Sequence, residues 1–152
     1  MAALGSTRFA KWLNAEILQM SYNWQWLAPV GRPVIFQIEL TNHCPMTCEM
    51  CPRTHQMTRK LGHMPFDLYT RIIDEAARST RAVLLHHFGD SLVHPDIGRF
   101  IKYAHERGVL GFLSANPVLL TDRRIAALVD NRPCTDWVEI ANVGAARLRM
   151  SC

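Results

Sequence analysis

Long apolar runs, dense basic clusters and an even, widely spaced set of cysteines are all missing from this sequence of 152 residues. The longest apolar stretches, such as Val83-Leu84-Leu85, are far too short to span a bilayer. The first residues also lack a basic segment followed by a sustained apolar run, so no secretory signal is expected. We therefore expect a cytoplasmic protein that has no membrane partner.

The charge of the chain is mild and evenly spread. Lys and Arg number 17 against 13 Asp and Glu, which gives a net charge of +4. Nucleic-acid binding needs basic residues gathered on one face, so no nucleic-acid partner is expected. With 49% hydrophobic residues and no low-complexity segment, the chain has the composition and length of one globular domain.

The cysteines have an unusual distribution. Cys44, Cys48 and Cys51 account for three of the five cysteines in the chain. A secreted disulfide framework spaces its cysteines widely, and neighbours this close bridge one another only with strain. The pattern indicates reduced thiolates that surround a metal ion or cluster.

Apolar periodicity divides the chain into three parts. Residues 1–32 are predicted to form an N-terminal helical extension, residues 33–144 a core, and residues 145–152 an irregular tail. Within the extension, residues 8–28 show a helical repeat whose aromatic stripe is expected to pack onto the domain. A helix that binds a membrane surface or a partner is less favoured, because its polar face is not strongly basic.

The core alternates predicted strands with predicted helices. Strands are expected at residues 34–40, 82–85, 109–113 and 137–140. Caps for the intervening helices are expected at Asp67, at Asp96, and at Thr121 or Asp122, with Gly108 ending the second helix. This order predicts an α/β fold with a parallel sheet, in which strand 137–140 is left as an open edge.

Notable segments follow three of these strands. They are the cysteines, Phe88-Gly89-Asp90 and Ser114-Ala115-Asn116-Pro117. Because ligands bind at the carboxyl ends of parallel strands, the three segments predict a shared site. His94, in a His-Pro-Asp sequence, is expected to be structural and to fix the turn into the next helix.

The spacing C-x3-C-x2-C suits an iron–sulfur cluster that keeps one iron open to a ligand. Cys134 and Cys152 are candidates for a fourth ligand. The alternative is a zinc site completed by His43 or His55, although zinc sites usually place two ligand pairs far apart.

Read together, residues 33–144 resemble the radical SAM superfamily. The segment Cys48-Glu-Met-Cys51-Pro52-Arg53 is similar to the branch that often carries a C-terminal SPASM domain. The segments Phe88-Gly89-Asp90 and Ala115-Asn116-Pro117 resemble the family's glycine-glycine-glutamate and Thr-Asn-Gly stretches. The resemblance implies a partial (β/α) barrel, and this chain is expected to be truncated after about three and a half βα units.

The resemblance also implies roles for individual residues. Cys44, Cys48 and Cys51 would hold a [4Fe-4S] cluster whose fourth iron is chelated by S-adenosylmethionine (SAM). Met50 would lie near the adenine, Gly89 and Asp90 near the methionine part of SAM, and Asn116 is the residue that carries over directly from Thr-Asn-Gly.

The implied activity is that of a radical SAM enzyme. An electron donor such as flavodoxin or ferredoxin would reduce the cluster, and cleavage of SAM would start hydrogen abstraction from a peptide or small molecule. A non-catalytic module that binds iron–sulfur or zinc, or an inactive remnant, is the alternative.

Overall fold

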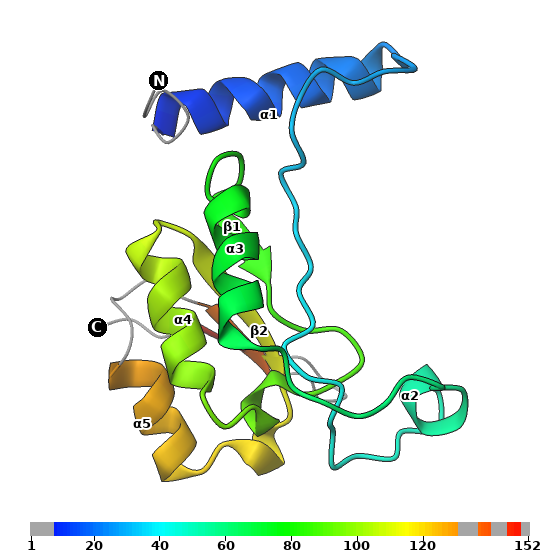
Figure 1. Cartoon of the computed structure of the whole chain (residues 1–152), viewed down its shortest axis with the longest axis vertical. Helices are drawn as coiled ribbons and strands as arrows, with labels where there is room; N and C mark the ends of the chain where they lie inside the picture. The colour runs from blue at the N-terminus through cyan, green and yellow to red at the C-terminus, as the bar shows by residue number, and fades with distance from the viewer. Residues whose placement is uncertain (1–7, 131–136, 141–145, 150–152) are drawn as a thin grey trace.

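The protein is described by a computed structural model that covers residues 8–130, 137–140 and 146–149. A sheet carries three helices on one face, and a long N-terminal helix lies across one end of the domain (Figure 1). Within the described residues, none of the helices has the length and apolar character needed to cross a membrane.

The sheet has four strands, which are neighbours in chain order. They are β1 (Ala82–Leu84), β2 (Leu110–Ala115), β3 (Trp137–Ile140) and β4 (Ala146–Arg149). The first three are parallel, with Leu84 opposite Phe112 and Ala115 opposite Ile140, as the sequence predicts. The expectation of an open edge at residues 137–140 is wrong, because β4 pairs antiparallel with β3 and covers that edge.

The first predicted strand, residues 34–40, is present as an extended segment beside β1. The Leu84 N–H donates to the Phe36 carbonyl, and the Ile38 N–H donates to the Leu84 carbonyl, both at 2.8 Å. These two bonds flank a single parallel bridge between Gln37 and Leu84, so the ladder is too short to form a regular strand. The prediction was therefore right about position and wrong about regularity.

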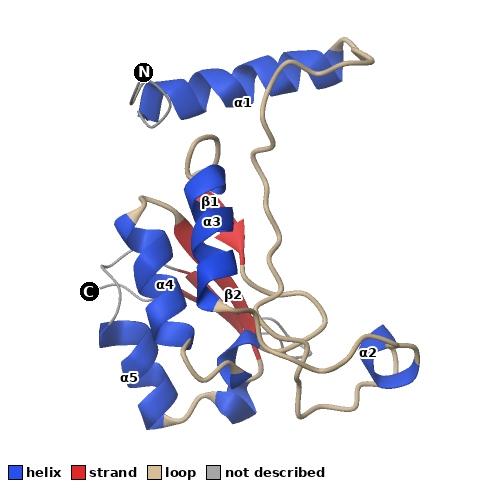
Figure 2. Cartoon of the chain, viewed as in Figure 1, coloured by secondary structure: helices blue, strands red, loops and turns tan. Residues whose placement is uncertain are grey.

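Helices α3 (Phe66–Ala76), α4 (Ile97–Glu106) and α5 (Asp122–Asp130) pack on one face of the sheet (Figures 1 and 2). The short helices α2 (Pro52–His55), η1 (Ser91–Val93) and η2 (Pro117–Leu119) lie in the loops. Residues from the sheet and from these three helices bury their apolar side chains together, and each fully buried side chain stabilises the fold by roughly 1.5–3 kcal/mol. The core contains Ile38, Leu40, Tyr69, Ile73, Val83, Leu85, Phe100, Ile101, Leu113 and Leu128.

Most of the predicted helix boundaries are confirmed. Asp96 is the N-cap residue of α4, and Gly108, with φ of 67°, follows its end. Thr121 precedes α5, and its Oγ1 accepts from the Arg124 N–H at 3.4 Å. The cap expected at Asp67 is wrong: Pro65 is the N-cap residue of α3, and Asp67 lies in its first turn.

The N-terminal helix α1 spans Arg8–Asn23, so the prediction of a helix over residues 8–28 was too long. Gln25 adopts φ of 50°, a left-handed conformation that ends the helical path. The aromatic stripe does not pack onto the domain as expected, since Trp12 and Phe9 are 52% and 66% exposed.

Candidate functional site

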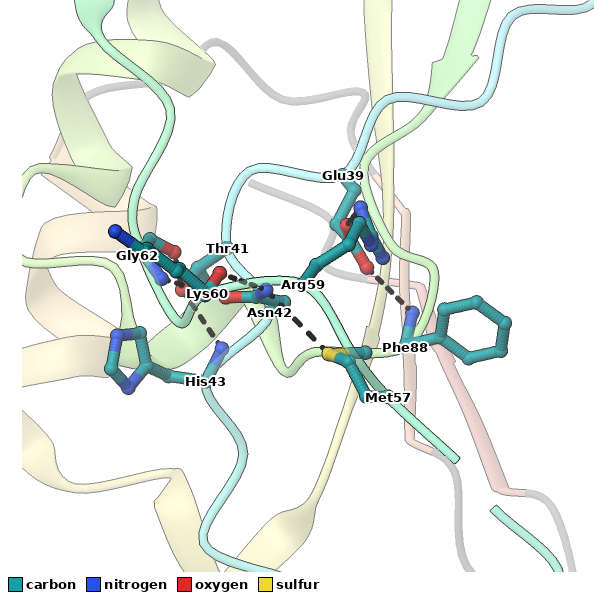
Figure 3. Close-up of polar contacts among 9 residues, drawn as sticks. All are labelled: Glu39, Thr41, Asn42, His43, Met57, Arg59, Lys60, Gly62 and Phe88. Atoms are coloured by element: carbon teal, nitrogen blue, oxygen red, sulfur yellow. Dashed lines mark hydrogen bonds and ion pairs between the residues drawn. The ribbon is translucent and has the colours of Figure 1, made fainter. Parts of the chain in front are cut away.

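The stem of the cysteine loop is closed by a set of hydrogen bonds that we call the clasp, made by Thr41, Asn42, Lys60 and Gly62 (Figure 3). The Asn42 side chain donates to the Lys60 carbonyl at 2.9 Å and accepts from the Gly62 N–H at 2.8 Å. Thr41 Oγ1 donates to the Gly62 carbonyl at 2.9 Å. Because Thr41 and Asn42 are buried, these bonds are shielded from water and fix both ends of the loop.

Glu39 joins this stem to the turn that follows β1. One of its carboxylate oxygens accepts from the Phe88 N–H at 3.1 Å, and the other pairs with Arg59 at 2.8 Å (Figure 3). Glu39 was not among the site residues predicted from the sequence. The alternation of polar Gln37 and Glu39 with apolar Ile38 and Leu40 was the signal that pointed to it.

Gly89 is pressed against the backbone of the clasp. A Cβ atom at this position would lie 1.9 Å from the Thr41 carbonyl oxygen and 2.8 Å from the Asn42 Cα. The next residue reinforces the contact, because the Asp90 N–H donates to the His43 carbonyl at 2.9 Å. The absence of a side chain at Gly89 therefore lets two loops meet, and its predicted role toward SAM stays a prediction.

Asp90 connects three of the loops at the carboxyl ends of the parallel strands. Its carboxylate accepts from the Leu92 N–H at 3.0 Å and from the Asn116 N–H at 2.9 Å. Burial raises the pKa of this carboxyl group, while the two amide hydrogen bonds oppose the rise. Asn116 is likewise engaged, because its side-chain oxygen accepts from the Val118 N–H and caps η2.

His94 lies buried beneath these loops. Its Nδ1 accepts from the Asp96 N–H at 3.1 Å, and its Nε2 lies 3.3 Å from the Met64 carbonyl. Burial lowers the pKa of the imidazole, although the bond to Met64 acts in the opposite direction. These contacts place the ring at the turn into α4, and the predicted structural role of His94 is confirmed.

The three cysteines lie on the loop that the clasp closes. Cys44 and Cys51 are half-buried, Cys48 is exposed, and all three thiols are free. The Met50 side chain, predicted to lie near adenine, is 92% exposed. In the part of the chain that the structure describes, no three His, Cys, Asp or Glu side chains are gathered closely enough to hold a metal ion. This applies equally to the cysteine set and to zinc sets completed by His43 or His55, whereas Cys134 and Cys152 lie outside the described residues.

The donor chemistry of this loop fits an iron–sulfur cluster. Its three thiols are unpaired, and thiolates are the ligands that such clusters use. The hydrogen bonds described for residues 44–51 are local: the Cys51 N–H donates to the Cys48 carbonyl, the Thr54 N–H donates to the Cys51 carbonyl, and the Arg53 side chain donates to the Met46 carbonyl. The stem is thus fixed by side-chain hydrogen bonds, whereas the bonds described within the loop do not reach beyond residue 54.

Comparison with known proteins places these features in a family. The profile of the Radical SAM superfamily matches residues 38–141. A PqqA peptide cyclase of Rhodopseudomonas palustris is 32% identical over 102 residues, which cover 66% of this chain and 26% of that protein. A cofactor-modifying protein of Pyrococcus furiosus, named for the tungsten-containing aldehyde ferredoxin oxidoreductase, is 30% identical over 95 residues, or 61% of this chain and 26% of that protein.

Solved structures agree on the fold. The crystal structure of BtrN in complex with AdoMet and 2-DOIA superimposes with a TM-score of 0.59 at 18% identity, and covers 69% of this chain and 45% of that one. The chain spans about a quarter of the length of the curated relatives it matches. The peptide cyclases among them are SPASM-type radical SAM proteins, the branch named from the cysteine segment. On the match over residues 38–141, the chain belongs to the radical SAM superfamily.

Proposed function

We propose that this chain forms the cluster-binding part of a radical SAM enzyme. Cys44, Cys48 and Cys51 would hold a [4Fe-4S] cluster, and SAM would chelate the iron that they leave open. The observation that carries the proposal is three free thiols on a loop whose stem is fixed at the carboxyl ends of parallel strands. When bound, the cluster and SAM together supply a one-electron cleavage that produces a hydrogen-abstracting radical.

The chain's own residues would shape the place where SAM binds. Gly89 brings the turn after β1 against the clasp, and Asp90 ties that turn to Asn116. Both carboxylate oxygens of Asp90 already accept one amide hydrogen bond. A carboxylate oxygen has more than one acceptor site, so Asp90 keeps the capacity to accept from the SAM ammonium group.

Substrate, electron donor and compartment belong to the same proposal. The names of the relatives point to a peptide in one case and to a cofactor in the other, so we propose hydrogen abstraction from a peptide or small molecule. A flavodoxin or ferredoxin would supply the electron. Free thiols suit a reducing compartment, which supports a cytoplasmic location.

The test is anaerobic reconstitution of the full chain with iron and sulfide. We expect a four-iron cluster by metal analysis, and an EPR signal of the reduced cluster that changes when SAM is added. Cys48→Ser should abolish the cluster, whereas the control Lys102→Ala, at an exposed position of α4 outside the predicted site, should retain it.

Two results would overturn the proposal. Stoichiometric zinc in place of iron would indicate a structural metal module. The second is a cluster whose EPR signal does not change when SAM is added and which is lost on Cys134→Ser or Cys152→Ser. This result would mean that a cysteine of the chain itself is the ligand of the fourth iron.

A further inference from the structure

The extended segment that precedes the cysteine loop has one unpaired backbone edge. On its other edge, the Phe36 carbonyl accepts from the Leu84 N–H, and the Ile38 N–H donates to the Leu84 carbonyl. Alternate residues of an extended chain direct their backbone groups to opposite edges, so those of Ile35 and Gln37 face away from β1. Within the described residues, neither of these two residues has a partner for its backbone N–H or carbonyl. Two donors and two acceptors are therefore open to another chain.

This edge lacks the features that normally protect a free edge from association. Proteins protect such edges with charged side chains, prolines or bulges. The run Val34-Ile35-Phe36-Gln37-Ile38 carries neither charge nor proline, and Ile35 is 72% exposed. Strand β4, at the opposite side of the sheet, instead has the sequence Ala-Arg-Leu-Arg. The β-branched and aromatic residues of the run favour strand pairing, so the unprotected edge suits an added strand.

The edge lies beside the candidate site. The segment continues directly into Thr41 and Asn42 of the clasp, and from there into the cysteine loop. In Figure 1 the segment runs along one side of the domain, and no described helix or strand lies on its outward side. The end of α1 and helix α2 both extend further to that side. A second copy of the chain would bring its own α1 and α2 against these projections, whereas a single strand brings neither.

We propose that Ile35 and Gln37 bind an extended peptide as an added β-strand beside the cysteine loop. Backbone groups of the peptide would pair with the two unpaired N–H groups and the two carbonyls, which is how exposed sheet edges recognise peptides. A β-branched side chain of the peptide would pack beside the exposed Ile35. The inference rests on the proposed function only for the role of the peptide, which would be that of substrate. Its binding depends on backbone pairing and needs no cluster.

The test uses the full, metal-free chain and a fluorescein-labelled peptide with the sequence Lys-Thr-Val-Thr-Val-Thr-Val-Lys. We expect fluorescence anisotropy to give a dissociation constant of about 0.1 mM, as suits a short ladder. Hydrogen exchange followed by NMR should show the amides of Ile35 and Gln37 slowed about tenfold by saturating peptide. The Ile38 amide, which already donates to Leu84, should change little.

Variants at Gln37 separate the backbone from the side chain. Gln37→Pro removes the outward N–H but keeps both bonds to Leu84, because proline is tolerated where the N–H faces away from a ladder. This variant should bind the peptide about tenfold more weakly, or worse. Gln37→Ala is the matched control: it loses the side-chain bond to the His86 carbonyl but keeps the N–H, and it should bind as the parent does.

The peptide itself supplies a test that does not depend on how the variants fold. N-methylation at every second residue leaves one donating edge and should preserve binding, whereas N-methylation at every residue should abolish it.

Four results would overturn the proposal. They are no binding at a chain concentration of about 1 mM, binding that survives full N-methylation, and binding that leaves the Ile35 and Gln37 amides unprotected. The fourth is a dimer in sedimentation equilibrium that Gln37→Pro dissociates and the peptide does not. Because no metal is present, failure here leaves the cluster-binding proposal untouched, and a chain that holds no cluster could still bind the peptide.

Discussion

The junction around Asp90 and the cysteine loop beside it are built in opposite ways. At the junction, Asp90 is buried, its carboxylate accepts two backbone amides, and Gly89 contacts the clasp with no space to spare. In the loop, Cys48 and Met50 are exposed and the described hydrogen bonds are local. The two regions are neighbours in space, yet the first is rigidly specified and the second is not.

This difference indicates which part of the site geometry the chain fixes by itself and which part would depend on the proposed cluster. Polar groups that are buried and fully bonded fix geometry, because breaking any one of their bonds leaves an unsatisfied group. Thiols on an exposed loop gain their geometry from the metal that they bind. The chain therefore supplies the frame around the site, and the cluster would supply the shape of the loop.

The largest expected effect comes from filling the contact at Gly89. Gly89→Ala would place a methyl group 1.9 Å from the Thr41 carbonyl oxygen, which forces two backbone segments apart. We expect a loss of about 4 kcal/mol in the free energy of unfolding, measured by urea denaturation. Gly62→Ala is the control, since no atom lies within 4 Å of the Cβ position there. Equal effects of the two substitutions would show that the junction is not rigid.

The next largest loss of stability is expected when the Asp90 carboxylate is removed. Asp90→Ala leaves the Leu92 and Asn116 amides without their partner. Hydrogen bonds to a charged group contribute about 1.5–3 kcal/mol each, so we expect a loss of about 3 kcal/mol by the same measurement. Asp96→Ala should cost less than about 1 kcal/mol, because Asp96 starts α4 without a side-chain cap bond. A small effect at position 90 would contradict the view that the Asp90 carboxylate holds the junction together.

A smaller effect should appear as a pH dependence set by His94. Burial holds the pKa of this imidazole below its ordinary value of 6.5, so the unfolded chain takes up a proton more readily than the folded one. The stability is then fully present above pH 6.5 and is lost as the pH falls through that value. Urea unfolding at pH 7.5 and pH 5.5 should show this loss, and His94→Gln should reduce it. An unchanged pH dependence in the variant would assign the effect to other groups.

The smallest effect is expected in the cysteine loop. Cys48→Ser in the metal-free chain should change the free energy of unfolding by less than about 0.5 kcal/mol, because the thiol is exposed. The same substitution should abolish cluster binding. Stability and cluster content should therefore respond very differently to this one change. Marked destabilisation of the metal-free chain would mean that the loop is as tightly built as the junction.

The regular core could be predicted from local pattern. Residues 82–84 and 137–140 carry mostly apolar side chains, and both are strands. Helix α4 follows from the spacing of Ile97, Phe100 and Ile101, and Gly108 marks its end. In these segments, the apolar residues whose spacing predicts the element are the same residues that pack in the core and stabilise it.

The parts of the fold and of the site that could not be predicted depend on contacts between residues far apart in the sequence. Strand β4, with sequence Ala-Arg-Leu-Arg, has too little apolar pattern to reveal that it pairs with β3. The bonds of Asn42 to Lys60 and of Asp90 to Asn116 join residues that no local pattern connects. The stripe on α1 was visible in the sequence, but periodicity says only that a stripe exists and not what it faces.

The contact between Gly89 and Thr41 has a consequence for how such a protein matures. Because the turn after β1 and the stem of the loop interlock through their backbones, the polypeptide can reach its final framework before any iron arrives. Assembly of the proposed cluster would then be a separate, later event on a framework whose loops are already docked.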